Sequence, residues 1–182
     1  MAWLGGAMPG SRRPLMHIVV MGVSGTGKTT VAVQLAEELG CQFIEGDDLH
    51  PSRNIAKMKA GTPLTDEDRW PWLQAIAEMV AVRDFEGTST VVTCSALKRS
   101  YRDVLRDSAP TFFVHLHAPF EVLEERMQHR TKHFMPGSLL KSQFDTLEEL
   151  EDDEAGAVVD VSAPVDEVVE ESVNAVRVHF TR

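Results

Sequence analysis

The sequence predicts a three-layer α/β domain, in which helices cover both faces of a five-stranded parallel sheet. Two observations predict this fold. Short apolar runs alternate along the chain with segments of helical periodicity, as in successive βαβ units. The runs are also apolar on both faces, which is typical of strands covered by helices on each side. The expected strands are His17–Val23, Cys41–Glu45, Thr90–Cys94, Thr111–His117 and Ala157–Val161.

Segments with helical periodicity lie between these apolar runs. In the first helical segment Val31, Leu35 and Leu39 recur at every fourth position, and Gly40 follows as a stop signal. Later segments begin with first-turn signals, such as a proline or a group of acidic residues after Thr65. The expected helices are Lys28–Leu39, Pro51–Lys59, Asp66–Val82, Arg99–Arg106, Pro119–Gln128, Leu139–Leu147 and Val165–Val178.

Composition excludes several classes of protein. With 43% hydrophobic and 25% charged residues, the 182-residue chain can bury a core and is not generally disordered. A net charge of −10 excludes the broad basic field that binds nucleic acid or anionic lipid. No apolar stretch approaches the roughly 20 residues of a membrane span. We therefore expect a cytoplasmic protein with no nucleic-acid or membrane partner.

A phosphate-binding loop separates the first expected strand from the first expected helix. The eight residues from Gly22 to Thr29 fit G-x-x-x-x-G-K-[ST], the P-loop. Its glycines let backbone N–H groups converge on an anion, and the helix N-terminus adds its dipole. Lys28 is expected to reach the β- and γ-phosphates of ATP, and the Thr29 hydroxyl to bind Mg²⁺. The expected loop contacts are Gly22, Val23, Ser24, Gly25, Thr26, Gly27, Lys28, Thr29 and Thr30.

Acidic residues follow the second strand rather than the third. The third strand ends in Cys94-Ser95, without a Walker B acid, and no Asn-Lys-x-Asp guanine-reading motif occurs. This arrangement suits a small-molecule kinase: Glu45 can help to hold Mg²⁺, while Asp47 orients the acceptor hydroxyl and takes its proton. Asp48 is the alternative to Asp47. Because adjacent strand residues point to opposite faces, we expect only one of the two to face the site.

Blocks of residues along the chain then resemble a known family. In order they are Glu45–Pro51, Asn54 with Lys57-Met58, Gly61–Leu64, Asp66–Arg69 with Pro71–Leu73, Cys94–Lys98 with Tyr101–Asp103, and His133-Phe134 with Gln143–Glu148. The set resembles the gluconate kinases (gluconokinases), P-loop kinases related to shikimate kinase, over about residues 16–180. The resemblance implies ATP- and Mg²⁺-dependent phosphorylation of the 6-hydroxyl of D-gluconate to 6-phospho-D-gluconate, in sugar-acid catabolism feeding the pentose phosphate pathway. It also implies a homodimer.

A site for gluconate needs cations for the carboxylate and short polar groups for the hydroxyls. Suitable side chains lie at or just after strand ends and helix starts, where ligands bind in open α/β sheets. They are Asp47, His50, Arg53, Arg69, Ser95 and Lys98. Three of them have structural alternatives: His50 can simply begin a helix, Arg69 can pair with the acids that precede it, and Lys98 can be a surface lysine.

A basic segment, Arg126–His133, resembles the lid of this kinase superfamily. Lid closure would exclude water, which competes as a phosphoryl acceptor. Arg130 would then place a positive charge over the γ-phosphate, and it would join Lys28 and Asp47 as a catalytic residue. Arg126 would lie over the adenine. The alternative is a solvent-facing pair of arginines on a helix.

The expected domain plan is a flexible extension at 1–15 and a P-loop kinase domain at 16–182, with a mobile lid at about 126–150. Between Asp145 and Glu154 seven of ten residues are acidic, and such runs usually face water, so we expect a solvated loop there.

Two other functions remain open at this point. A nucleotide-dependent switch or ATPase would hydrolyse ATP slowly without an acceptor and would bind a large protein partner. A kinase of the same fold could instead phosphorylate shikimate, a nucleotide or adenylyl sulfate.

Overall fold

Five parallel strands form one sheet in the order β2-β3-β1-β4-β5. The computed structural model describes residues 14–130 and 136–182. The strands are β1 (His17–Met21), β2 (Gln42–Glu45), β3 (Thr90–Thr93), β4 (Thr111–His117) and β5 (Gly156–Asp160). The expected five-stranded parallel sheet is confirmed, and every strand boundary lies within two residues of its expected position.

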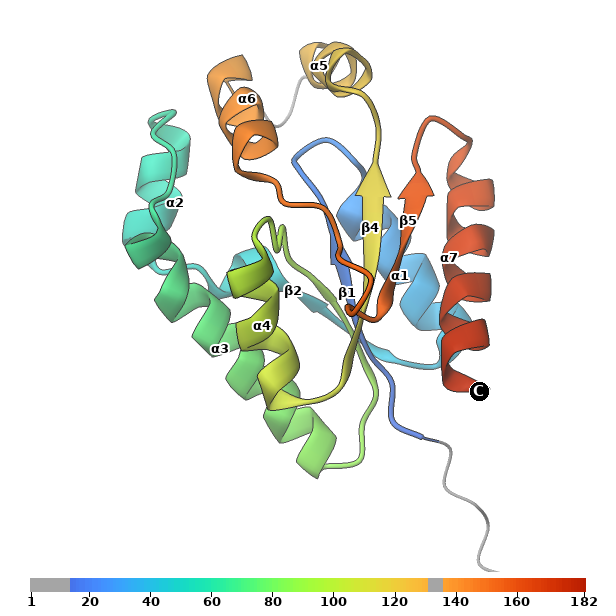
Figure 1. Cartoon of the computed structure of the whole chain (residues 1–182). Helices are drawn as coiled ribbons and strands as arrows, with labels where there is room; N and C mark the ends of the chain where they lie inside the picture. The colour runs from blue at the N-terminus through green and yellow to red at the C-terminus, as the bar shows by residue number, and fades with distance from the viewer. Residues whose placement is uncertain (1–13, 131–135) are drawn as a thin grey trace, which may run out of the picture.

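Helices cover both faces of the sheet and complete the three layers. Figure 1 shows α1 beside α7 on one face and α3 beside α4 on the other, while α5 and α6 lie beyond the carboxyl ends of the strands. A short 3-10 helix, η1 (Gly46–Leu49), follows β2. The α-helices are α1 (Lys28–Leu39), α2 (Ser52–Lys59), α3 (Asp66–Phe85), α4 (Arg99–Ser108), α5 (Phe120–Gln128), α6 (Gly137–Thr146) and α7 (Val165–Phe180).

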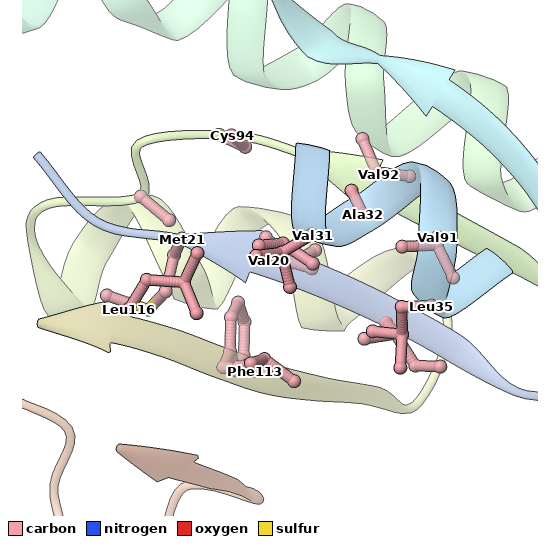
Figure 2. Packing of buried hydrophobic residues seen from close by; sticks show 14 of the residues in the cluster. Val20, Met21, Val31, Ala32, Leu35, Val91, Val92, Cys94, Phe113 and Leu116 are labelled. Atoms are coloured by element: carbon pink, nitrogen blue, oxygen red, sulfur yellow. The ribbon is translucent and has the colours of Figure 1, made fainter. Parts of the chain in front are cut away.

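The core lies around the central strand. All five residues of β1 are buried, in agreement with a strand that is covered on both faces. Figure 2 shows Val20 and Met21 of β1 in one cluster with Leu35 of α1 and with Phe113 and Leu116 of β4. Each such side chain contributes roughly 1.5–3 kcal/mol by burial. The loop that follows β1 therefore starts from a firmly held strand.

Strand β1 ends two residues earlier than expected, at Met21. Gly22 has a φ of 138°, and a Cβ atom there would lie 2.6 Å from the carbonyl oxygen of Leu116. The Gly22 N–H donates to the Ser95 carbonyl, 3.2 Å away, after β3 has ended. The positive φ and the close approach of Gly22 to the Leu116 carbonyl thus turn the backbone out of the sheet at the first residue of the P-loop.

The acidic run is not simply a solvated loop, so that expectation is wrong for Glu154. Its side chain is buried and accepts two hydrogen bonds from Arg102 of α4. Arg102 also donates to the carbonyl oxygens of Ala96, Glu148 and Glu149. Arg102 therefore holds the acidic run against α4, just before β5 begins.

Residues 1–13 of the expected N-terminal extension, and 131–135 with His133, lie outside the described residues. The backbone N–H of Met16 donates to the Ser89 hydroxyl at 2.9 Å, which ties the chain to the sheet just before β1. Within 14–130 and 136–182, no helix combines the length and apolar character needed to cross a bilayer.

Candidate active site

The P-loop has the curled backbone that a phosphate cradle requires. Gly25 and Gly27 adopt left-handed conformations, with φ of 83° and 85°, which residues with a Cβ atom rarely adopt. The Nζ atom of Lys28 donates to the carbonyl oxygens of Gly22 (3.1 Å) and Val23 (3.0 Å). Lys28 is therefore held over the loop, where it can meet a bound phosphate.

Opposite charges face each other across this loop. Burial lowers the pKa of Lys28, whereas the nearby Asp47 carboxylate raises it. Desolvation in turn raises the pKa of Asp47, and the charge of Lys28 lowers it. Each charge partly offsets the desolvation of the other.

Oxygen ligands lie at the start of α1 and the end of β2. The Thr29 hydroxyl donates to Oε2 of Glu45 at 2.7 Å, and the Thr93 hydroxyl donates to Oε1 of Glu45. Such oxygens suit Mg²⁺, which usually completes its coordination with water and substrate phosphates. Across the described parts of the chain, no group of three or more His, Cys, Asp or Glu side chains can hold a metal. Thr29 and Glu45 therefore offer a partial set of oxygens of the kind that Mg²⁺ prefers.

The turn after β2 is a 3-10 helix, so the expected strand alternation at Asp47 and Asp48 is wrong. Gly46 is buried, donates to the Thr93 hydroxyl (3.0 Å) and accepts from the Trp72 indole N–H (2.8 Å). A Cβ atom at Gly46 would lie only 1.9 Å from the Thr93 carbonyl oxygen. This close packing bends the chain so that Asp47 lines the cleft, whereas Asp48 does not.

An acceptor cleft opens beside the P-loop, between η1, the start of α3 and α6. Four of the six side chains expected to bind the acceptor meet two P-loop residues there. They are Ser24, Lys28, Asp47, His50, Arg69 and Ser95. Cationic, acidic and hydroxyl groups therefore share one cleft, as binding of a polyhydroxy acid requires.

Two expected acceptor contacts do not line this cleft. Arg53 has an exposed side chain on α2. Lys98 donates to Oδ1 of Asp66 at 3.1 Å, just before α4. Arg69 does face the cleft, and its Nη1 donates to the Tyr101 hydroxyl at 3.2 Å. Of these three cations, Arg69 is the one placed to meet an anionic ligand.

Of the lining residues that were not expected from the sequence, two make specific contacts with expected ones. Trp72 is 2% exposed, yet it lines the cleft and stacks on His50 with ring centroids 4.0 Å apart. Gln143 of α6 accepts a hydrogen bond at Oε1 from the Ser24 N–H, at 2.7 Å. Both belong to the blocks that carry the family resemblance, which was the available signal; no local pattern assigns them a contact.

A second cleft continues from the other side of the P-loop. It combines Gly25, Thr30, Arg126 and Arg130 with an apolar wall. That wall is Val161, Ala163, Val165 and Val168. Nη2 of Arg126 donates to a carbonyl of the wall, 2.6 Å away, and Arg130 also lines the space over Lys28 and Asp47. The second cleft therefore places an apolar surface and two arginines beside the P-loop.

These features define a class. A P-loop between β1 and α1, acidic residues after β2, and an acceptor cleft beside Lys28 are the parts of a P-loop kinase that acts on a small molecule.

Comparisons with known proteins give the family. A family model described as an AAA domain matches residues 18–150. The chain is 52% identical over 155 residues to a gluconokinase of Gluconobacter oxydans, covering 85% of this chain and 87% of the relative. It is 43% identical over 164 residues to the thermoresistant gluconokinase of Escherichia coli, covering 88% and 94%. The crystal structure of a gluconokinase from Sinorhizobium meliloti superimposes with a TM-score of 0.85 at 53% identity, covering 94% and 96%. The chain belongs to the gluconokinase family, and the resemblance seen in the sequence is confirmed.

Proposed function

We propose that this protein transfers the γ-phosphoryl group of ATP to the 6-hydroxyl of D-gluconate, giving 6-phospho-D-gluconate and ADP. The observation that carries the proposal is the meeting of Lys28 and Asp47 at one cleft, between the phosphate cradle and the acceptor side chains. Family membership adds the acceptor, because the relatives that match this chain over most of its length are named gluconokinases.

On the nucleotide side, the P-loop amides and Lys28 hold the phosphates of ATP. Thr29 and Glu45 supply the protein's oxygens for Mg²⁺, whose role when bound is to offset the negative charge of the phosphates. Arg130 provides further positive charge beside the γ-phosphate, and Arg126 flanks the adenine.

On the acceptor side, Asp47 accepts the proton of the 6-hydroxyl as its oxygen attacks the γ-phosphorus. The bond from that phosphorus to the β–γ bridging oxygen breaks, and ADP leaves. Arg69 faces the gluconate carboxylate, while His50 and Ser95 supply hydrogen bonds to hydroxyls. Gln143 links α6 to the P-loop and lines the same cleft.

A panel assay tests the acceptor. ADP release is measured with ATP and Mg²⁺ and with gluconate, shikimate, adenylyl sulfate or a nucleoside monophosphate. Only gluconate is expected to support fast release, and the phosphorylated product should carry its phosphate at carbon 6. Faster turnover on another member of the panel, or equal ADP release without an acceptor, would remove the substrate assignment.

We also propose a cytoplasmic homodimer, as the family resemblance implies, and a lid at about 126–150 attached to a kinase domain at 16–182. Light scattering on the purified protein measures the oligomeric state. Hydrogen exchange with and without ATP tests the lid: α6 amides should become more protected when nucleotide binds, while those of β1 should not change.

A further inference from the structure

A buried amide lies behind the acceptor cleft. Asn54 of α2 is completely buried, and its Nδ2 atom donates to the backbone carbonyl of Asp68 in α3, at 2.8 Å. The same Nδ2 atom lies 3.2 Å from Nδ1 of His50. Asn54 thus connects α2 and α3 to an imidazole ring that lines the cleft.

The orientation of this amide is determined by its partners. A backbone carbonyl only accepts hydrogen bonds, so the amide nitrogen of Asn54, not its oxygen, must face Asp68. The second N–H of that nitrogen then points to His50 Nδ1, which can accept only if it carries no proton. The Asn54 oxygen has no hydrogen-bond partner among the described residues, so no contact seen there favours the flipped amide.

His50 cannot easily turn away from this contact. Its ring stacks on Trp72, with centroids 4.0 Å apart and an interplanar angle of 15°. Burial and the positive charge of Arg69 lower the pKa of His50 to about 4, so the ring is neutral at physiological pH. A neutral ring that accepts at Nδ1 carries its proton at Nε2.

The Nε2 atom of His50 lies 3.9 Å from Oδ1 of Asp47. That distance is too long for a direct hydrogen bond, but a hydroxyl oxygen can lie about 2.8 Å from both atoms. Such a hydroxyl would accept from His50 and donate to Asp47, which leaves a lone pair for attack on phosphorus.

We propose that Asn54 is a positioning residue that fixes His50 as its Nε2–H tautomer, so that His50 and Asp47 form a donor–acceptor pair for the reacting hydroxyl of the sugar acid. The inference rests on the proposed function for the identity of that hydroxyl. The tautomer itself is a property of the protein without substrate.

Nitrogen NMR of the full chain, labelled at histidine, measures the tautomer directly. The His50 signals, among seven histidines, are assigned with the His50→Gln variant. In the wild type Nδ1 should be unprotonated and Nε2 protonated. Asn54→Asp replaces the donor with an acceptor, and Nδ1 should then become protonated. A protonated Nδ1 in the wild type, or an unprotonated Nδ1 in folded Asn54→Asp, would overturn the inference.

Kinetics separate positioning from simple loss of structure. In Asn54→Asp, kcat/KM for gluconate should fall about tenfold or more, while KM for ATP stays within twofold of the wild type. The matched control is Thr65→Ala, which removes the cap that accepts from the Asp68 N–H, next to the Asn54 contact. It should weaken α3 yet keep the wild-type tautomer and kcat/KM; an equal kinetic loss in Thr65→Ala would overturn the positioning role.

If Asn54→Asp does not fold, the wild-type spectrum still decides whether Nδ1 of His50 is unprotonated. A wild type with this tautomer that fails to phosphorylate gluconate would overturn the proposed function and the pairing with its hydroxyl.

Discussion

Arg102 and Glu154 form an ion pair that is completely removed from solvent, with Nε to Oε1 at 2.7 Å and Nη2 to Oε2 at 2.9 Å. Arg102 comes from α4, whereas Glu154 closes the acidic run just before β5. The remaining donors of Arg102 reach backbone carbonyls, including that of Ala96 beside the acceptor cleft. The pair thus joins the segment after α6 to the loop that follows β3.

Glu154→Gln is expected to destabilise the protein by about 3 kcal/mol, because it leaves the Arg102 charge buried without its counter-ion. Urea unfolding followed by circular dichroism measures the change. Asp153→Asn, which alters an exposed partner of Arg99 in the same run, is the control and should remain close to the wild type. Equal effects of the two substitutions would show that burial of the Arg102–Glu154 pair has no special weight.

Lys28→Ala is expected to reduce phosphoryl transfer by about 10³-fold or more, since no other side chain in the loop carries its charge to the phosphates. Single-turnover kinetics with saturating ATP isolate this effect from nucleotide affinity. Lys141→Ala, on the exposed surface of α6, serves as the control and should retain full activity. Near-normal turnover by folded Lys28→Ala would exclude a catalytic role for the lysine.

Asp47→Asn should lower kcat by roughly 10²-fold, the usual scale of general-base assistance. Asp48→Asn should be much milder, because Asp48 does not line either cleft beside the P-loop. Glu45→Gln belongs in the same series and should raise the Mg²⁺ concentration needed for half-maximal rate. The assignment of the base is wrong if Asp48→Asn is the inactive variant and Asp47→Asn is nearly normal.

The two arginines on the acceptor side are expected to behave differently. Arg69→Ala removes the cation that faces the cleft and should raise KM for gluconate by about tenfold or more, as loss of a charge-assisted hydrogen bond does. Arg53→Ala, with its exposed side chain, should change KM by less than twofold. Steady-state kinetics on the pair provide the comparison; a large effect at Arg53 would mean that α2 moves toward the substrate.

Acid should destabilise the fold through its buried histidines. Burial, chiefly, lowers the pKa of both His50 and His115 to about 4. Between about pH 6.5 and 4 the unfolded chain therefore binds more protons, so stability is full above pH 6.5 and falls on acidification. Each histidine contributes a slope of up to about 1.4 kcal/mol per pH unit.

Urea titrations between pH 4.5 and 7.5 measure this slope. His115→Gln should flatten it, while His129→Gln, at an exposed position, should leave it unchanged. A slope that is the same in both variants would mean that His115 titrates normally in the folded protein.

The strands were predictable because a contiguous apolar run indicates by itself that the segment is buried. The central strands β1 and β4 show this, and Thr111–His117 has its expected bounds. Local pattern failed at Gly46, where the chain leaves the strand one residue before Asp47. The 3-10 turn there depends on Thr93 and Trp72, which lie 47 and 26 positions further along the chain.

The site residues also differ in whether local sequence could predict them. The P-loop was predictable because its residues are contiguous and its backbone makes the contacts. The contact of Gln143 with Ser24 spans 119 positions, and the contact of Asn54 with Asp68 depends on how α2 meets α3. The prediction for the acidic run was wrong at Glu154 because a high density of charge, taken alone, predicts exposure to solvent. The partner that buries Glu154 is Arg102, which lies 52 positions away in the sequence.

Gly46 has an evolutionary consequence. Any side chain at this position would overlap the Thr93 carbonyl, and the same backbone turn presents Asp47 to the cleft. Selection for a well-folded protein and selection for an active enzyme would therefore retain the same residue. A lineage that had lost the activity but still folded would be expected to keep this glycine, so its presence in a relative is weak evidence of catalysis, whereas retention of Asp47 beside it is more informative.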